Sequence, residues 1–210
     1  MPLTRRVIAI RLFNLKKELS LTDLILASAS PRRLALLEQI GVVPDEICPA
    51  DIDETPFAQE APHRYAVRMA VSKAEKIAAL KPGRFILAAD TVVACARRIL
   101  PKAETREQAA ACLNLLSGRR HTVYGGICLI TPDGSKLTRS VKTVVAFSRL
   151  HPSDKRAYLD GGEWQGKAGG YAVQGQAALF VRRIIGSYSN VVGLGLFETG
   201  RLLKGRGVIK

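Results

Sequence analysis

The chain has 210 residues, of which 47% are hydrophobic and 24% are charged, and its formal net charge is +14. This composition excludes wholesale disorder, and no apolar run approaches the roughly 20 residues that a membrane-spanning helix needs. The length suits one domain or two closely packed lobes, and the basic excess points to a polyanionic partner.

Short apolar strands alternate with helices in the first half of the chain. The pattern predicts a buried strand at 24–27, a helix at 33–40, an extended segment at 42–49, a helix at 63–79, a strand at 85–89 and an extended continuation at 92–95. Gly41 is placed to end the first of these helices.

The second half continues the alternation. Thr105 and Gln108 form a capping-box signature for a helix that runs to about Leu116. The later predictions are strands at 121–131 and 136–147 around a Pro-Asp-Gly turn, a short helix at 152–159, a strand at 180–185 and a helix at 197–203. These elements predict an α/β domain of two lobes with a cleft between them.

The basic charge is concentrated at the two ends. The first 20 residues and the last ten residues each carry four more basic than acidic side chains. We therefore interpret 1–22 as a basic N-terminal extension, 23–204 as one two-lobed catalytic domain and 205–210 as a basic C-terminal tail. Four cysteines lack the spacing of a zinc or redox site, which favours reduced thiols and a cytoplasmic protein.

The segment Ala27-Ser28-Ala29-Ser30-Pro31-Arg32-Arg33 joins a predicted strand to a predicted helix. Ser30 suits the N-cap and a proline suits the first helical position. A well-capped helix explains part of this pattern. Ser28 and Arg32 add further donors beside free backbone N–H groups, which predicts a phosphate-binding turn.

A glycine-rich segment, 161–167, resembles a Walker A loop, but Ala168 replaces the hydroxyl residue that would contact Mg²⁺. We reject a P-loop there, while Lys167 remains a candidate phosphate ligand and a surface lysine is the alternative. In the following segment, 169–176, Gln174 offers both a donor and an acceptor, as reading a nucleobase edge requires.

Two acidic features are candidates for chemistry. Asp90 ends an apolar strand, where it either caps a turn or lies at a cleft floor to bind a metal or activate water. Glu54 belongs to an acidic run that is either a solvated loop or a site for Mg²⁺ or Mn²⁺. Lys73 and Lys102 are candidates to neutralise phosphate charge, and each is otherwise a surface residue.

The motifs LILASASPRRLALLEQIGV, DIDET, ADTVV, LSGRRHTVYGG and GKAGGYAVQGQAALFVRRIIGSYSNVVGL occur in this order. From about Leu24 to Leu203 the chain resembles the Maf (septum formation protein) family of nucleoside triphosphate pyrophosphatases. The resemblance implies an elongated mixed sheet, similar to inosine triphosphate pyrophosphatases, with two lobes flanking a substrate cleft. It also implies divalent-metal-dependent hydrolysis of a nucleoside triphosphate to the monophosphate and pyrophosphate.

The resemblance also implies residue roles. Asp90 matches the proton acceptor, while Glu54, Lys73 and Lys102 match positions around the metal and phosphates, with Glu54 and Asp90 as metal ligands.

Arg32, Thr91 and Gln174 match the subgroup that hydrolyses dTTP and UTP, where a 7-methyl-GTP subgroup would carry Trp, Gln and Glu. The sequence departs from the family pattern at 95–98, at Ala103 and at Gly195, and these departures affect loop geometry rather than the chemistry.

The leading hypothesis is thus a dTTP/UTP pyrophosphatase that cleanses modified nucleotides or is linked to cell-division arrest. Its alternative is a non-enzymatic division regulator or nucleic-acid-binding protein, which would not need the acidic residues. We expect a nucleoside triphosphate as partner, with no membrane and no nucleic acid, and leave a homodimer open.

Overall fold

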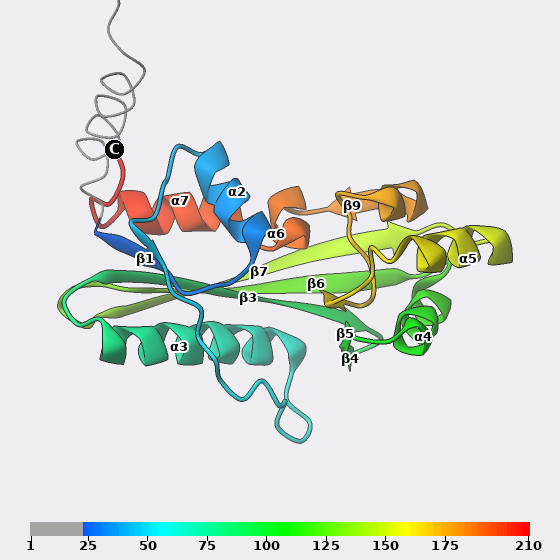
Figure 1. Ribbon diagram of the computed structural model, residues 1–210, viewed down its shortest axis with the longest axis horizontal. Helices are drawn as coiled ribbons and strands as arrows, with labels where there is room; N and C mark the ends of the chain where they lie inside the picture. The colour runs from blue at the N-terminus through cyan, green and yellow to red at the C-terminus, as the bar shows by residue number, and fades with distance from the viewer. Residues whose placement is uncertain (1–22) are drawn as a thin grey trace, which may run out of the picture.

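The computed structural model describes residues 23–210, so the predicted extension at 1–22 lies outside the described residues. The described chain is built on one seven-stranded mixed sheet and a separate two-stranded sheet. Its longest strands form a platform that runs the length of the molecule, with helices above and below (Figure 1).

The large sheet has the strand order β2-β1-β3-β6-β7-β9, and β4 pairs with β3 beside this path. Its strands are β1 (Leu24–Leu26), β2 (Glu46–Ile47), β3 (Phe85–Cys95), β4 (Arg98–Leu100), β6 (Arg120–Ile130), β7 (Lys136–Phe147) and β9 (Val181–Ile185). β1 is parallel to both β2 and β3, whereas the remaining pairings are antiparallel. The two-stranded sheet pairs β5 (Lys102–Ala103) with β8 (Lys167–Ala168).

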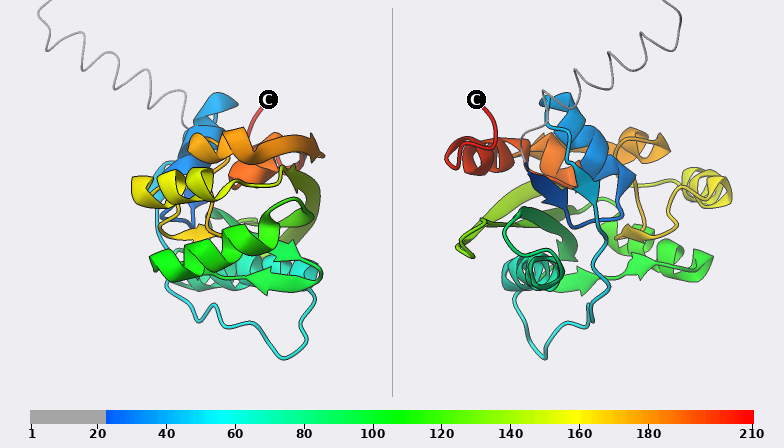
Figure 2. Two further views of the ribbon diagram at one scale, coloured as in Figure 1. Left: turned by 90° about the vertical axis from the view of Figure 1, so that its right-hand side faces the viewer. Right: turned by 60° about the vertical axis from the view of Figure 1, so that its left-hand side comes forward.

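The helices cover the sheet in layers (Figures 1 and 2). α3 (Pro62–Leu80) lies along one face, against β3 and β6. On the other face lie α2 (Pro31–Gln39), α6 (Tyr188–Val192) and α7 (Leu196–Lys204). The end of the sheet away from β1 carries α4 (Arg106–Leu116), α5 (Pro152–Gly161) and the 3-10 helix η1 (Gln176–Phe180).

The core follows from the two-residue period of the strands. In β3, Ile86 and Ala88 pack with the α3 face, whereas Leu87 and Ala89 pack with the opposite helices. Both faces of β3 are therefore buried, which explains its nearly continuous apolar sequence. A fully buried side chain such as Leu87 contributes about 1.5–3 kcal/mol relative to exposure.

A glycine lets α3 approach the sheet closely. A Cβ atom at Gly126 in β6 would lie 2.0 Å from the carbonyl oxygen of Ala66 in α3, closer than any ordinary contact. The absence of a side chain at this position therefore sets the depth at which α3 packs. Because Asp90 pairs with Gly126 in the sheet register, the same approach brings α3 toward that carboxylate.

Two local predictions are confirmed, the capping box and the Pro-Asp-Gly turn. Both arms of the capping box formed by Thr105 and Gln108 are present, and Gly134 has the positive φ that its turn requires. The four cysteines are free thiols. Over residues 23–210, moreover, the structure contains no helix long and apolar enough to cross a membrane.

Other elements differ from the prediction. The helix expected at 33–40 begins at Pro31 with Ser30 as N-cap, because proline needs no N–H partner in the first turn. Of the extended segment 42–49, only β2 pairs as a strand. The short elements β4, β5, β8 and α6 were not predicted, since segments of two to five residues carry little periodicity.

The end of the chain is docked onto the fold. Val208 is buried in the main core, and its backbone N–H donates to the carbonyl of Leu203 in α7. The segment predicted as a basic tail therefore carries an apolar anchor among its charges.

Candidate active site

A cavity of about 380 Å³ lies at the carboxyl end of β1. β1 pairs with β3 only as far as Leu87, and β4 joins β3 only from Val93 onward. Between these points the edge of β3 has no strand beside it, and Asp90 and Thr91 lie in this gap. The crevice beyond the carboxyl end of a parallel strand is the usual ligand position in open α/β sheets.

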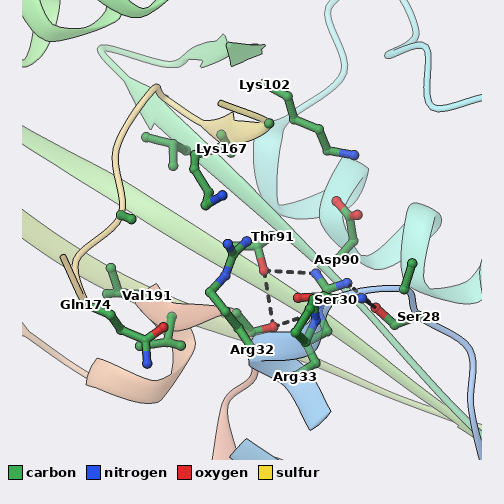
Figure 3. Close-up of a pocket in the computed structure, with 18 of the residues that line it drawn as sticks. Ser28, Ser30, Arg32, Arg33, Asp90, Thr91, Lys102, Lys167, Gln174 and Val191 are labelled. Atoms are coloured by element: carbon green, nitrogen blue, oxygen red, sulfur yellow. Dashed lines mark hydrogen bonds between the residues drawn. The ribbon is translucent and has the colours of Figure 1, made fainter. Parts of the chain in front are cut away.

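The ten residues that we predicted for the site all line this one cavity. They are Ser28, Ser30, Arg32, Glu54, Lys73, Asp90, Thr91, Lys102, Lys167 and Gln174. Figure 3 shows side chains from several separate segments of the chain turned toward the same space. Their convergence is a property of the fold, while their individual roles stay predictions.

One side of the cavity is an acid–lysine cluster, composed of Glu54, Lys73, Asp90 and Lys102. The Lys73 ammonium lies 2.6 Å from Asp90 Oδ1 and 2.7 Å from Glu54 Oε1, and Lys102 pairs with the other oxygen of Glu54. Burial raises the pKa of Glu54, but the hydrogen bonds from Lys102 and Lys73 outweigh it and lower the pKa to about 2. Glu54 is therefore ionised at neutral pH.

The pairing explains how Asp90 and Lys73 tolerate burial. Asp90 is 5% exposed and Lys73 is 7% exposed, and either charge alone would be costly at such a position. Lys73 comes from the buried face of α3, and Asp90 from the face of β3 that α3 covers. Among the described residues, Lys73 donates to Asp90 Oδ1 and no group donates to Asp90 Oδ2.

Beside this cluster lies an arginine wall, composed of Ser28, Arg33 and Thr91. The Arg33 guanidinium donates to Ser28 Oγ at 2.9 Å, to Thr91 Oγ1 at 3.3 Å and to the Gly193 carbonyl at 2.9 Å (Figure 3). Burial lowers the pKa of Arg33 from its ordinary value, but a guanidinium stays protonated. All three partners are neutral, so this positive charge is not cancelled by a salt bridge.

Sequence reasoning chose Arg32 and missed Arg33. Both residues line the cavity, but Arg33 alone is fixed by side-chain hydrogen bonds. The Arg-Arg doublet was the available signal, yet the choice depends on how α2 is rotated. Ser30 also differs from expectation, because its side chain makes no cap hydrogen bond and its N–H donates to Ser28 Oγ instead.

The third side of the cavity is the segment 166–176, which carries Lys167 and Gln174. The β5–β8 ladder pairs Ala103 with Lys167 and Lys102 with Ala168, so it brings two lysines to one edge of the cavity. The rest of the segment is held to the large sheet by a hydrogen bond of 2.8 Å between the hydroxyl of Tyr171 and Nε2 of His121 in β6. Burial and the neighbouring Arg32 lower the pKa of Lys167.

The charges of the lining give the cavity its chemical character. Two acids, Glu54 and Asp90, are both paired with lysines, while the described residues give Arg32, Arg33 and Lys167 no acidic partner. The cavity is therefore positive overall, with one carboxylate oxygen accessible. This arrangement suits a bound polyanion that is attacked by water.

The carboxylates of the cavity form an incomplete donor set for a metal ion. Within residues 23–210 no group of three or more His, Cys, Asp and Glu side chains could hold a metal by itself. Two neighbouring carboxylates nevertheless fit Mg²⁺, which is commonly bound through one or two carboxylates together with substrate phosphates. The residues present thus fit a metal shared with a substrate better than a metal caged by protein alone.

Comparison with known proteins extends this picture. A family model described as "Maf-like protein" matches residues 23–206. The chain is 60% identical over 184 residues to a dTTP/UTP pyrophosphatase of Paramagnetospirillum magneticum, covering 88% of this chain and 97% of that protein. A dTTP/UTP pyrophosphatase of Rhodospirillum rubrum is also 60% identical over 184 residues, covering 88% of each chain.

The fold has a counterpart among solved structures. A HAM1 protein from Coxiella burnetii superposes with a TM-score of 0.51 at 19% identity, covering 87% of this chain and 98% of that one. The predicted α/β fold class and the family resemblance are therefore confirmed. Because the family model spans residues 23–206 and a relative at 60% identity covers 88% of the chain, the chain belongs to the Maf family.

Proposed function

We propose that this chain is a nucleoside triphosphate pyrophosphatase that hydrolyses dTTP and UTP to the monophosphate and pyrophosphate. The observation that carries the proposal is the juxtaposition, in one cavity, of a lysine-paired Asp90 and a cationic wall without acidic partners. The names of the relatives at 60% identity support the same reaction and the same substrates.

The proposed reaction is an attack by water on the α-phosphorus. Asp90 Oδ2 accepts the proton of the water, a bond forms from the water oxygen to phosphorus, and the bond from that phosphorus to the oxygen bridging the β-phosphate breaks. Pyrophosphate carries away the electron pair. Lys73 holds the other oxygen of Asp90, at 2.6 Å, and so keeps the accepting oxygen turned to the cavity.

The cations supply electrostatic stabilisation rather than covalent chemistry. Arg33 has five N–H groups, three of which are used by protein partners. The remaining two are available to a phosphate on a guanidinium that is already fixed, so little ordering is needed on binding. Lys102 and Lys167 flank the same space and would neutralise further phosphate charge.

A divalent cation is part of the proposal. Glu54 and Asp90 would hold Mg²⁺ or Mn²⁺ together with phosphate oxygens of the substrate. When bound, the ion would neutralise phosphate charge and make the attacking water more acidic.

Base choice is proposed to depend on Gln174. Its exposed amide lines the cavity beside Val191 (Figure 3). An amide can both donate to and accept from the O4 and N3–H edge of uracil or thymine, whereas cytosine reverses the group at C4. Thr91 and Arg32 complete the predicted trio, and the hydroxyl of Thr91 is fixed by the carbonyl of Gly193 at 3.3 Å.

The proposal is tested by hydrolysis of a nucleotide panel with Mg²⁺, with Mn²⁺ and with a chelator. We expect pyrophosphate release from dTTP and UTP well above that from CTP, ATP and GTP, and none with the chelator. Equal kcat/KM for ATP and UTP would contradict the base choice. Absence of hydrolysis combined with salt-sensitive DNA binding would favour the nucleic-acid-binding alternative.

We also propose a cytoplasmic location, because nucleoside triphosphates are made there and free thiols stay reduced there. A homodimer remains a prediction, which sedimentation of the purified protein tests.

A further inference from the structure

The cavity wall formed by α6 is small but central. α6 has only five residues, yet Val191, Val192 and the following Gly193 all line the cavity. The carbonyl of Gly193 accepts hydrogen bonds from Arg33 Nε at 2.9 Å and from Thr91 Oγ1 at 3.3 Å. The position of the arginine wall therefore depends on where this short helix is held.

Asn190 holds α6 against the sheet. Its side chain is fully buried, and its amide Nδ2 donates to the carbonyl of Val123 in β6 at 3.2 Å and to Thr143 Oγ1 in β7 at 3.0 Å. Thr143 Oγ1 also donates to the carbonyl of Ser187 and accepts the N–H of Ser187. One side chain thus ties the helix and the turn before it to two strands.

The sheet makes room for this asparagine by carrying a glycine, Gly125, opposite its amide. A Cβ atom at Gly125 would lie 2.0 Å from Asn190 Oδ1 and 3.2 Å from its Cγ. Gly125 pairs with Thr91 in the sheet register, so the amide packs on the strand position next to the arginine wall. Two motifs with no role in the proposed chemistry, YGG at 124–126 and SYSN at 187–190, are therefore two halves of one contact.

Packing alone does not account for an asparagine here. Asn190 Oδ1 is buried and has no hydrogen-bond partner among the described residues, and an orphaned acceptor is costly. A leucine of similar volume would avoid that cost but would not donate to Val123 or Thr143. The amide is thus suited to fixing α6 in one position rather than to maximising stability.

We propose that Asn190 is a positioning residue for substrate binding, acting through the Gly193 carbonyl on Arg33 and Thr91. The inference rests on the proposed function. In this inference the Asn190–Gly125 contact preorganises the phosphate-binding Arg33. Loss of the contact would displace α6, and with it Val191, which lies beside Gln174 (Figure 3). The effect is expected on substrate binding more than on the chemical step, because among the described residues no hydrogen bond or ion pair joins the acid–lysine cluster to Asn190, Gly193 or Arg33.

The experiment compares Asn190→Ala with the wild type in the full chain, using dTTP with Mg²⁺. We expect KM to rise about 10-fold or more while kcat falls less than about 3-fold, since misplaced binding groups act mainly on uniform binding. Titration calorimetry with inorganic pyrophosphate, which needs no turnover, is expected to show the same loss of affinity. Thr143→Val removes one of the two acceptors and is expected to have a smaller effect in the same direction.

Leu116→Ala is the matched control. Leu116 is fully buried in α4 and does not line the cavity, so its truncation lowers stability without moving α6. KM should be unchanged in this variant below its unfolding temperature. Unchanged KM and pyrophosphate affinity in folded Asn190→Ala or in Thr143→Val would overturn the proposal, as would an equal rise in the Leu116→Ala control.

Gly125→Ala tests the same contact from the sheet side. The added methyl group should displace the Asn190 amide and raise KM to a similar extent. The double variant of Gly125→Ala with Asn190→Ala should be no worse than either single variant, because both changes break one contact. Additive effects would contradict the inference. The activity of the wild type tests the proposed function by itself, so a failure of the proposed function is distinguishable from a failure of the inference about Asn190.

Discussion

The two sides of the cavity hold their charges in opposite ways. In the acid–lysine cluster, Glu54 and Asp90 are matched by Lys73 and Lys102, so the charges nearly cancel. In the arginine wall, Arg33 is held by two hydroxyl groups and a backbone carbonyl, so its charge is kept. Both sides are held by hydrogen bonds, but only the arginine wall is left without a balancing negative charge.

The difference explains how one cavity can bind a polyanion and also support the attack of water on it. A balanced cluster holds a carboxylate in a fixed orientation without repelling a phosphate. An unbalanced wall attracts the phosphate but would be unsuited to hold a base. If this division is correct, changes in the acid–lysine cluster should act on turnover, and changes in the arginine wall should act on binding.

The largest effect is expected from Asp90→Asn. The amide is nearly isosteric but cannot accept the proton of water, so kcat should fall at least ~10²-fold. KM should change little, and the fold should persist, as circular dichroism would verify. If the variant keeps most of its turnover, Asp90 is not the base. The assignment of turnover to the acid–lysine cluster and of binding to the arginine wall would then be wrong.

Arg33→Ala should produce the complementary result. The loss of a fixed guanidinium is expected to raise KM about 30-fold or more and to lower kcat less, because a charge-assisted bidentate contact is lost. Arg32→Ala, which removes a neighbouring guanidinium without side-chain hydrogen bonds, is the matched control and should have a smaller effect. Steady-state kinetics on dTTP compare the two, and a larger effect of Arg32→Ala would reverse their assignment.

The third side of the cavity can be tested through pH. Burial lowers the pKa of His121 to about 4, so below its ordinary pKa of about 6.5 the unfolded chain binds a proton that the folded chain does not. Stability should therefore fall as pH drops from about 6.5 toward 4, by about 2 kcal/mol at pH 5 from this residue. Urea unfolding at pH 7 and pH 5 measures this, and His121→Gln should show a weaker pH dependence.

Base selectivity is a smaller effect. Gln174→Glu loses the amide donor and adds a negative charge, and we expect it to reduce the preference for UTP over CTP by about 10-fold. The measurement is the ratio of kcat/KM for the two nucleotides. A uniform fall for both, with the ratio preserved, would place Gln174 outside base recognition.

The smallest effect is expected from deletion of residues 1–20. We predict nearly unchanged pyrophosphatase turnover, because the described residues that line the cavity all lie between Ala27 and Gly193. Any retention on nucleic acid should fall with the deletion and weaken with salt. Loss of turnover in a folded, truncated protein would show that this segment helps to build one side of the cavity.

Sequence patterns predicted much of the fold. The capping box at Thr105, the buried strand that begins at Phe85 and the long helix at 63–79 depend on contacts between near neighbours in the chain, which periodicity and turn chemistry report directly. Contrary to the prediction, the strand does not end at Asp90 but continues through it to Cys95, because β6 pairs with β3 on both sides of Asp90. The candidate residues also line one cavity, as the family resemblance implied.

Sequence did not predict which charges pair and which do not. The Lys73–Asp90 pair requires α3 to lie against β6, and that approach depends on the missing side chain of Gly126. The selection of Arg33 over Arg32 as the fixed guanidinium depends on the rotation of α2 and on a carbonyl 160 residues further along the chain.

By itself, then, the sequence determined the order of strands and helices and the chemical types available to the site, because these follow from local composition and spacing. Only the tertiary structure decided the electrostatic difference between the two sides of the cavity and the anchoring of α6 by Asn190. Both of these depend on close approaches between segments distant in sequence, and no local pattern carries information about such distances.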